Sequence, residues 1–352
     1  MSDRGIPKNG DSVPSVWRGR PVLITGGASF IGSHLTDALV ARGAKVRVID
    51  NLSSGRAEYL AEYIRDGKVE FIKADLNTPG VADRVVEGSE VVFHLAADHG
   101  GRGYVDLHQA ACAANLALDG MLFLACRRAG VDKVVYASSG CVYPNFLQND
   151  PDEILYLREE MVGPPFDADN MYGWAKLMAE MTLRAYSRES GLKSASCRYF
   201  TVYGERGKED HAVIAMIARA FVGQDPFEVW GNGQQIRNWT YVGDIVTGTI
   251  LAAEKIDDGT AINLGTMERT RVIEAALEVL RYTGHKAEIK FRPDMPTGPV
   301  NRVADNALAR RLLGWEPQVK FMDGLHRTID WYVGSKDRDS IKERLELALT
   351  ER

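Results

Sequence analysis

The turn at residues 25–32, with the sequence Thr-Gly-Gly-Ala-Ser-Phe-Ile-Gly, constrains the fold more than any other part of this chain. It joins an apolar run at 21–25 to a stretch with helical spacing at 31–42. A glycine-rich turn between a buried strand and a helix places backbone N–H groups where they can hold a pyrophosphate. The next predicted strand, 45–49, leads into Asp50, eighteen residues after Gly32. An acidic residue there accepts hydrogen bonds from ribose hydroxyls and repels a 2′-phosphate, so the pattern favours NAD over NADP.

Short apolar runs recur at 69–72, 91–95, 133–137 and 194–199, with helical stretches between most of them. This alternation predicts an α/β fold, a Rossmann-type doubly wound parallel sheet. The pattern changes beyond residue 204, and the segment 261–264 returns to the sheet. We therefore expect an NAD-binding domain at 20–204 plus 243–264 and a smaller, discontinuous α/β substrate-binding lobe at 205–242 plus 265–333. Residues 1–19 are expected to form a flexible tail and 334–352 a charged C-terminal tail.

Composition excludes several other classes of protein. The 352 residues carry a net charge of −5 with no block of like charge, which argues against a nucleic-acid partner. The four cysteines form neither a disulfide framework nor a CxxC zinc motif, so no metal site is expected. We find neither a signal peptide nor an apolar run long enough to span a bilayer. The sequence predicts a cytoplasmic protein with no membrane partner.

Tyr172 and Lys176 are four residues apart and therefore share one face of a predicted helix. A nearby ammonium favours phenolate and lowers the pKa of the tyrosine, which makes it a base near neutral pH. Ser138 and Ser139 end the strand that precedes this helix, so a serine hydroxyl can reach the same substrate oxygen. The spacing predicts a Ser/Tyr/Lys site for hydride chemistry.

Together these motifs resemble the extended short-chain dehydrogenase/reductases over residues 21–333, with Ser29 where that family's turn has its middle glycine. The resemblance implies NAD as cofactor and Ser139, Tyr172 and Lys176 as catalytic residues. It places Arg237 and Arg302 at the diphosphate of a nucleotide-sugar substrate, although either could instead form an interdomain ion pair. The implied cofactor-binding residues are Gly26, Gly27, Ser29, Phe30, Ile31, Gly32, Asp50, Asn51, Asp75, Leu76, Leu95, Ala96, Ala97, Tyr172 and Lys176.

Three stretches, 95–103, 136–144 and 227–233, resemble the GDP-mannose 3,5-epimerase branch of that family. By this resemblance Cys141, two residues after Ser139, is an acid/base on the sugar ring, and Gly101, Arg102 and Gly103 contact the substrate. His211 stands where the branch has its partner lysine, and imidazole also exchanges protons near neutral pH. The implied reaction makes a transient 4-ketone, after which the protons at C3 and C5 become removable.

Other functions stay open at this point. Residues 50–55 resemble the corresponding stretch of UDP-galactose 4-epimerases, which would use Ser139, Tyr172 and Lys176 without Cys141. A 4,6-dehydratase is disfavoured because Gly140 and Cys141 replace its Asp-Glu pair. A non-catalytic NAD sensor would need only the turn and Asp50. The family resemblance also implies a homodimer built from two helices of each subunit, predicted at 110–129 and 172–190.

Overall fold

The computed structural model describes residues 15–348 and confirms the doubly wound α/β fold. Its central sheet has seven strands in the order β11-β6-β5-β4-β1-β2-β3, and all neighbouring pairs are parallel. The strands are β1 (Pro21–Thr25), β2 (Lys45–Asp50), β3 (Val69–Lys73), β4 (Val91–His94), β5 (Lys133–Ser139), β6 (Lys193–Tyr199) and β11 (Asp258–Leu264). Strand order reverses between β1 and β4, and a crevice opens at their carboxyl ends.

Helices cover both faces of this sheet because its strands are apolar on both sides. One face packs against α1 (Phe30–Ala41), α9 (Val242–Lys255) and α11 (Ala307–Leu313). The other packs against α3 (Val81–Val86), α6 (Asn115–Ala129) and α7 (Asn170–Ser190). Shorter helices are α2 (Ala61–Arg65), α4 (Arg102–Leu107) and α5 (Gln109–Ala113). Four 3-10 turns lie at Ala57–Leu60, Gly140–Val142, Asn145–Leu147 and Glu159–Met161.

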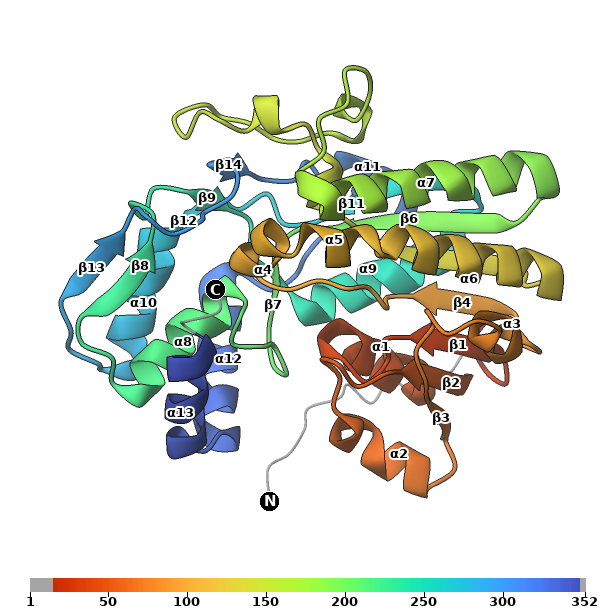
Figure 1. Cartoon of the computed structure of the whole chain (residues 1–352), viewed down its shortest axis with the longest axis horizontal. Helices are drawn as coiled ribbons and strands as arrows, with labels where there is room; N and C mark the ends of the chain where they lie inside the picture. Colours follow the sequence, from red (N-terminus) through yellow and green to blue (C-terminus); the bar gives the residue numbers. More distant parts are fainter. Residues whose placement is uncertain (1–14, 349–352) are drawn as a thin grey trace.

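A smaller lobe stands beside the carboxyl end of the sheet (Figure 1). Its helices are α8 (Ala212–Val222), α10 (Val272–Thr283), α12 (Phe321–Ser335) and α13 (Arg338–Ala348), and they enclose a separate apolar core. Its strands are β8 (Phe227–Trp230), β9 (Ile236–Arg237), β12 (Thr270–Arg271), β13 (Ile289–Arg292) and β14 (Asn301–Arg302). The pair β7 (Val202–Tyr203) and β10 (Thr240–Tyr241) lies between the lobe and the sheet. Because the lobe faces the switch point, the two parts enclose the crevice.

Both predicted tails need correction where the structure describes them. Residues 1–14 lie outside the described part, but Trp17 is buried against the sheet and its indole Nε1 donates to Glu254 Oε1 at 2.6 Å. At the other end, α13 packs on α8 through Ile341 and Leu345, which are 0% and 4% exposed. These two apolar residues are four apart, so they share a helix face that the surrounding charges obscure in the sequence.

The expectation that no apolar run could span a bilayer is also wrong by length and composition. The stretch Gln109–Ala129 passes both criteria. In the fold it is interrupted at Ala114 and divided between α5 and α6. The apolar side of α6 packs against the sheet and α3, including Leu122, Phe123 and Cys126, all 0% exposed. Its hydropathy therefore has a structural explanation as a core helix.

Candidate active site

The glycine turn brings β1, β2 and α1 into close contact. Gly26 has a φ of +68°, and a Cβ at Gly32 would lie 2.1 Å from the Gly26 carbonyl oxygen. A Cβ at Gly27 would lie 2.7 Å from Val48 of β2. Side chains are therefore excluded at all three positions, and the first turn of α1 stays open to a ligand.

Ser29, which stands at the middle-glycine position, turns its hydroxyl inward. Its Oγ donates to the Gly26 carbonyl at 2.5 Å and caps no helix amide. The residue lines the cavity together with Phe30, Ile31 and Gly32. Its side chain thus closes the turn on itself, and the amides at the start of α1 remain available to a phosphate.

Asp50 ends β2 beside this turn. Its two carboxylate oxygens accept the amide N–H groups of Ala28 at 3.0 Å and Leu52 at 2.8 Å. Burial raises the pKa of Asp50, although both amide bonds oppose the rise. Next to it, the Asn51 side-chain amide donates to Asp75 Oδ2 at 3.2 Å. The polar residues predicted around an adenosine therefore lie together at the ends of β2 and β3.

The remaining predicted cofactor residues follow the ends of β3 and β4. The amides of Leu95 and Ala96 both donate to the Thr25 hydroxyl at 3.1 Å, which holds the end of β4 beside the glycine turn. Leu95 and Ala97 line the cavity. Leu76 is 5% exposed, and its side chain packs in the core rather than facing the cavity.

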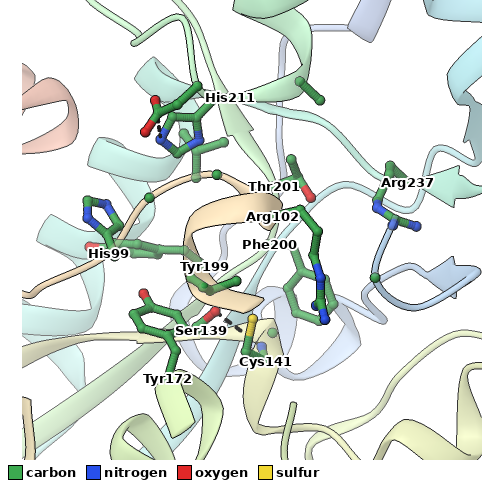
Figure 2. A pocket seen from close by; sticks show the side chains of 18 of the residues that line it. His99, Arg102, Ser139, Cys141, Tyr172, Tyr199, Phe200, Thr201, His211 and Arg237 are labelled. Atoms are coloured by element: carbon green, nitrogen blue, oxygen red, sulfur yellow. Dashed lines mark hydrogen bonds and ion pairs between the residues drawn. The ribbon is translucent and has the colours of Figure 1, made fainter. Parts of the chain in front are cut away.

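Ser139, Tyr172 and Lys176 line the same cavity, and Figure 2 shows Ser139 and Tyr172 near each other. Tyr172 lies in the first turn of α7, and Ser139 ends β5. The Lys176 ammonium is 2% exposed, donates to the Ala137 carbonyl at 2.8 Å and lies 5.6 Å from the centroid of the Tyr172 ring. The Ser139 hydroxyl, the Tyr172 phenol and the Lys176 ammonium therefore lie close together in one part of the cavity.

The protonation balance of Tyr172 differs from the prediction. Burial raises the pKa of Tyr172, the negative charges of Cys141 and Asp119 add to the rise, and a hydrogen bond with Ser139 opposes it. The sequence shows the neighbouring lysine, but it does not show how far the phenol is removed from water. Without a ligand the tyrosine therefore holds its proton, and additional positive charge is needed to release it.

Cys141 faces the cavity beside a network of charged groups. Arg302 donates from Nη1 to the Cys141 Sγ at 3.2 Å, from Nε to Gln148 at 2.7 Å and from Nη2 to Asp169 at 2.9 Å. Arg102 also binds Asp169, at 2.8 Å. Although burial opposes it, the charges of Arg302 and Arg102 lower the pKa of Asp169. The guanidinium of Arg302 therefore holds the Cys141 sulfur in place at the wall of the cavity.

Arg237 differs from the other two arginines because its described partners are backbone carbonyls. It donates to the oxygens of Ile236 at 2.8 Å and Thr297 at 2.7 Å. Burial lowers the pKa of Arg237, and the charges of Arg302 and Arg102 lower it further. A bound anion would relieve this repulsion, so the end of the cavity near Arg237 is suited to phosphate.

His211 lies across the cavity from Cys141 and is the residue before α8 (Figure 2). Its Nε2 lies 3.7 Å from Asp210 Oδ1. Gly101 allows this approach between loops, because a Cβ there would lie 2.0 Å from the Asp210 carbonyl oxygen. Gly103 lines an adjoining cavity with Trp230.

Sequence reasoning did not identify several residues of this cavity. His99 lies between His211 and Tyr172, with ring centroids 6.1 Å and 6.4 Å away. Lys208 and Trp230 also line the cavity, and Asp169 connects two of the arginines. His99 falls inside the stretch 95–103 that carries the branch resemblance, so its imidazole could have been identified as a candidate acid/base group from the sequence. The position of Asp169 depends on contacts between distant segments. Within residues 15–348 no group of acidic, histidine or cysteine side chains is arranged to hold a metal ion.

Known proteins resemble this chain over most of its length. The chain is 31% identical over 335 residues to GDP-mannose 3,5-epimerase 1 of Oryza sativa subsp. japonica, covering 94% of this chain and 84% of that protein. Its structure resembles the UDP-glucose 4-epimerase of Thermotoga maritima solved with UDP-glucose, with a TM-score of 0.81, 30% identity and coverage of 90% and 99%. The UDP-glucose 4-epimerase of Thermus thermophilus, solved with NAD, gives a TM-score of 0.79 at 28% identity, with coverage of 90% and 100%.

The family assignment follows from these findings. Residues 22–265, which are more than half of the chain, match the NAD dependent epimerase/dehydratase family. This match confirms NAD as the expected cofactor, and the glycine turn and Asp50 provide a site that fits it. The chain belongs to the NAD-dependent epimerase/dehydratase family, a group of extended short-chain dehydrogenase/reductases.

Proposed function

We propose that this chain is a nucleotide-sugar epimerase that works through a transient 4-keto sugar and exchanges protons at C3 and C5 of GDP-mannose or a related NDP-hexose. One observation carries the proposal: Cys141 and His211 lie on different sides of the cavity that also holds Tyr172. A 4-epimerase needs no such pair, because its only chemistry is at C4.

The first step forms the ketone at C4. Tyr172 accepts the proton of the C4 hydroxyl, and Ser139 holds the same oxygen by a hydrogen bond. NAD, held by the glycine turn and Asp50, would supply the hydride acceptor and donor for C4, and its positive charge would favour ionisation of Tyr172. Lys176 stabilises the phenolate from 5.6 Å away, measured from Nζ to the ring centroid.

The ring protons are exchanged in the second step. Protons at C3 and C5 lie next to the carbonyl and are acidic, so a positioned base removes them. Cys141, whose Sγ is contacted by Arg302 Nη1 at 3.2 Å, is placed to act as this base. His211, on the other side, delivers a proton to the opposite face of the ring. Tyr172 then returns its proton as the ketone is reduced, and no net oxidation occurs.

The substrate's diphosphate is held at the arginine end of the cavity. The guanidinium of Arg237 binds backbone carbonyls and not a carboxylate in the described structure, and Arg302 adds a second positive charge nearby. Arg102 is bound to Asp106 and Asp169 and therefore orients the loop that contacts the sugar. This division of roles gives a cavity with anion binding at one end and acid/base groups at the other.

A UDP-sugar 4-epimerase is the second candidate. The observation in its favour is the similarity to the Thermotoga maritima enzyme, which was solved with UDP-glucose. In that case Tyr172 and Lys176 would work as described, and Cys141 would only pack beside Arg302. A non-catalytic NAD sensor is less well supported, because it has no use for Ser139, Tyr172 and Lys176 in one cavity.

We also propose a homodimer through α5, α6 and α7, which pack side by side. Large apolar side chains on or beside these helices are left in solvent: Leu107 is 64% exposed, Leu116 42%, Trp174 37%, Met178 46% and Met181 37%. Covering them in a second copy of the chain would remove this apolar area from water. Light scattering at micromolar concentration should give twice the monomer mass of 38.9 kDa.

Two variants test the assignment of steps. Tyr172→Phe should abolish both reduction of bound NAD and isomerisation, because no base remains at C4. Cys141→Ser should keep NAD reduction and slow deuterium entry at C3 or C5 by about a hundredfold, a typical loss for one acid/base group. Cys126→Ser is the matched control, because that thiol is buried in the core. Full epimerase activity in Cys141→Ser would refute the ring-proton role.

A further inference from the structure

A chain of buried polar groups runs through the sheet behind the catalytic lysine, and the mechanism above does not use it. Thr25, His94, Asp119 and Tyr136 are each at most 2% exposed, and they come from β1, β4, α6 and β5. Thr25 Oγ1 lies 2.7 Å from His94 Nδ1, His94 Nε2 lies 2.9 Å from Asp119 Oδ1, and the Tyr136 hydroxyl lies 2.7 Å from Asp119 Oδ2.

The hydrogen-bond partners of these four buried side chains determine which atom donates in each bond. Thr25 Oγ1 already accepts the amides of Leu95 and Ala96, so its own proton goes to His94 Nδ1. His94 is therefore neutral and donates from Nε2 to Asp119. Tyr136 donates to the other carboxylate oxygen. Asp119 accepts at both oxygens, which is the pattern of an ionised carboxylate.

Asp119 consequently places a negative charge in the interior. Among residues 15–348 its one ion-pair contact is His94, whose imidazole is neutral because Nδ1 accepts the Thr25 proton. Lys176 lies over the Tyr136 ring, with Nζ 4.6 Å from the ring centroid. A phenol that donates to a carboxylate has a more electron-rich ring and attracts a cation more strongly. The anion, the ring and the ammonium form one electrostatic unit.

We propose that Asp119, acting through Tyr136, is the buried counter-charge that keeps Lys176 protonated and sets the pH range in which Tyr172 and Lys176 carry out hydride transfer. It is a positioning residue, since it touches neither substrate nor cofactor. The inference rests on the proposed hydride chemistry and holds equally for 3,5- and 4-epimerisation, because both begin at C4.

The surroundings of the two catalytic groups agree with this role. Burial lowers the pKa of Lys176, and the charges of Asp119, Cys141 and Glu180 raise it. Asp119 likewise raises the pKa of Tyr172, after burial and Cys141. Other titratable groups facing the pair are Cys112 and His99 beside Tyr172 and Tyr136 beside Lys176. Loss of the Asp119 charge therefore moves both pKa values in the same direction, downward.

The test is the pH profile of hydride transfer in Asp119→Asn, followed as reduction of bound NAD by a nucleotide sugar. A unit charge across one phenol ring, at an effective dielectric constant of about 20, shifts a neighbouring pKa by about one unit. Both limbs of the profile should move to lower pH by about that amount, with about a tenfold loss of rate on the alkaline side. A profile that keeps its position and only loses height would show that Asp119 is purely structural.

Asp244→Asn is the matched control, because Asp244 is a 7% exposed carboxylate at the start of α9 that binds the Val319 amide. Its profile should stay in place. Asparagine at 119 keeps only one acceptor oxygen for the two donors, His94 Nε2–H and Tyr136 O–H. Asp119→Asn/Tyr136→Phe removes one of these donors and provides a second variant with the same change in charge. It should show the same acid shift.

A measurement without substrate separates this inference from the proposed function. Lysine Cε chemical shifts of the NAD-bound protein, titrated by NMR and assigned with Lys176→Met, report the lysine pKa directly. That pKa should fall by about one unit in Asp119→Asn. If no nucleotide sugar reduces NAD but the lysine shifts, the proposed function fails and the counter-charge stands. An unshifted lysine overturns the inference whatever the activity.

Discussion

The buried ion pair between Arg198 and Glu180 should be essential to stability. Arg198 comes from β6 and Glu180 from α7, and their side chains are 2% and 0% exposed. Two parallel bonds join them, from Nε at 2.9 Å and Nη2 at 2.8 Å. The Ser138 hydroxyl also donates to Glu180, at 2.5 Å. Replacing Arg198 by methionine leaves the carboxylate buried without its cation.

Removing one partner of such a pair costs about 3–5 kcal/mol in the free energy of unfolding. Urea unfolding followed by circular dichroism should show this loss in Arg198→Met. The double variant Arg198→Met/Glu180→Leu removes both charges and should recover most of it. Arg20→Met breaks a surface pair with Glu90, 26% and 52% exposed, and should cost less than about 1 kcal/mol. A loss below about 1 kcal/mol in Arg198→Met, or additive effects in the double variant, would refute the reasoning.

Three further predictions concern the site. Gly32→Ala places a Cβ 2.1 Å from the Gly26 carbonyl oxygen, so NAD retained on purification should fall at least about tenfold, while Gly120→Ala, with open space around it, should retain NAD normally. Folding lowers the pKa of Asp169, so the ionised carboxylate stabilises the protein above its unfolded-state pKa near 4, and this stabilisation is lost as the pH falls through the folded-state pKa. Thermal unfolding should therefore show that Asp169→Asn loses less stability than the parent chain below about pH 4. His211→Asn should preserve NAD reduction and slow deuterium exchange, and unchanged exchange would remove His211 from the mechanism.

Local patterns predicted the parts of the fold and the site that depend on neighbouring residues. The glycine turn and Asp50 follow the ends of two consecutive strands, so their spacing in the sequence is enough to predict that they lie together. The Tyr172–Lys176 pair follows from helix geometry for the same reason. Trp17 and α13 were missed because one or two apolar residues in a polar segment give little signal until a partner surface is known.

Features assembled from several distant segments could not be predicted. The raised pKa of Tyr172 depends on burial by the surrounding structure, whereas the sequence shows only the lysine four residues away. The chain of buried polar groups around Asp119 joins four elements, and the Arg302–Asp169–Arg102 network joins three separate segments. In each case the interacting residues are far apart in the sequence, and only the folded chain brings them together.

Proton NMR of GDP-mannose incubated with the purified protein in D₂O, without added cofactor, tests the central claim most directly. The proposed mechanism predicts that deuterium enters at C3 or C5 while new sugar isomers appear, since Cys141 and His211 exchange ring protons with solvent. Isomerisation without deuterium at either carbon would contradict the ring-proton mechanism and identify a 4-epimerase in which Cys141 only packs beside Arg302.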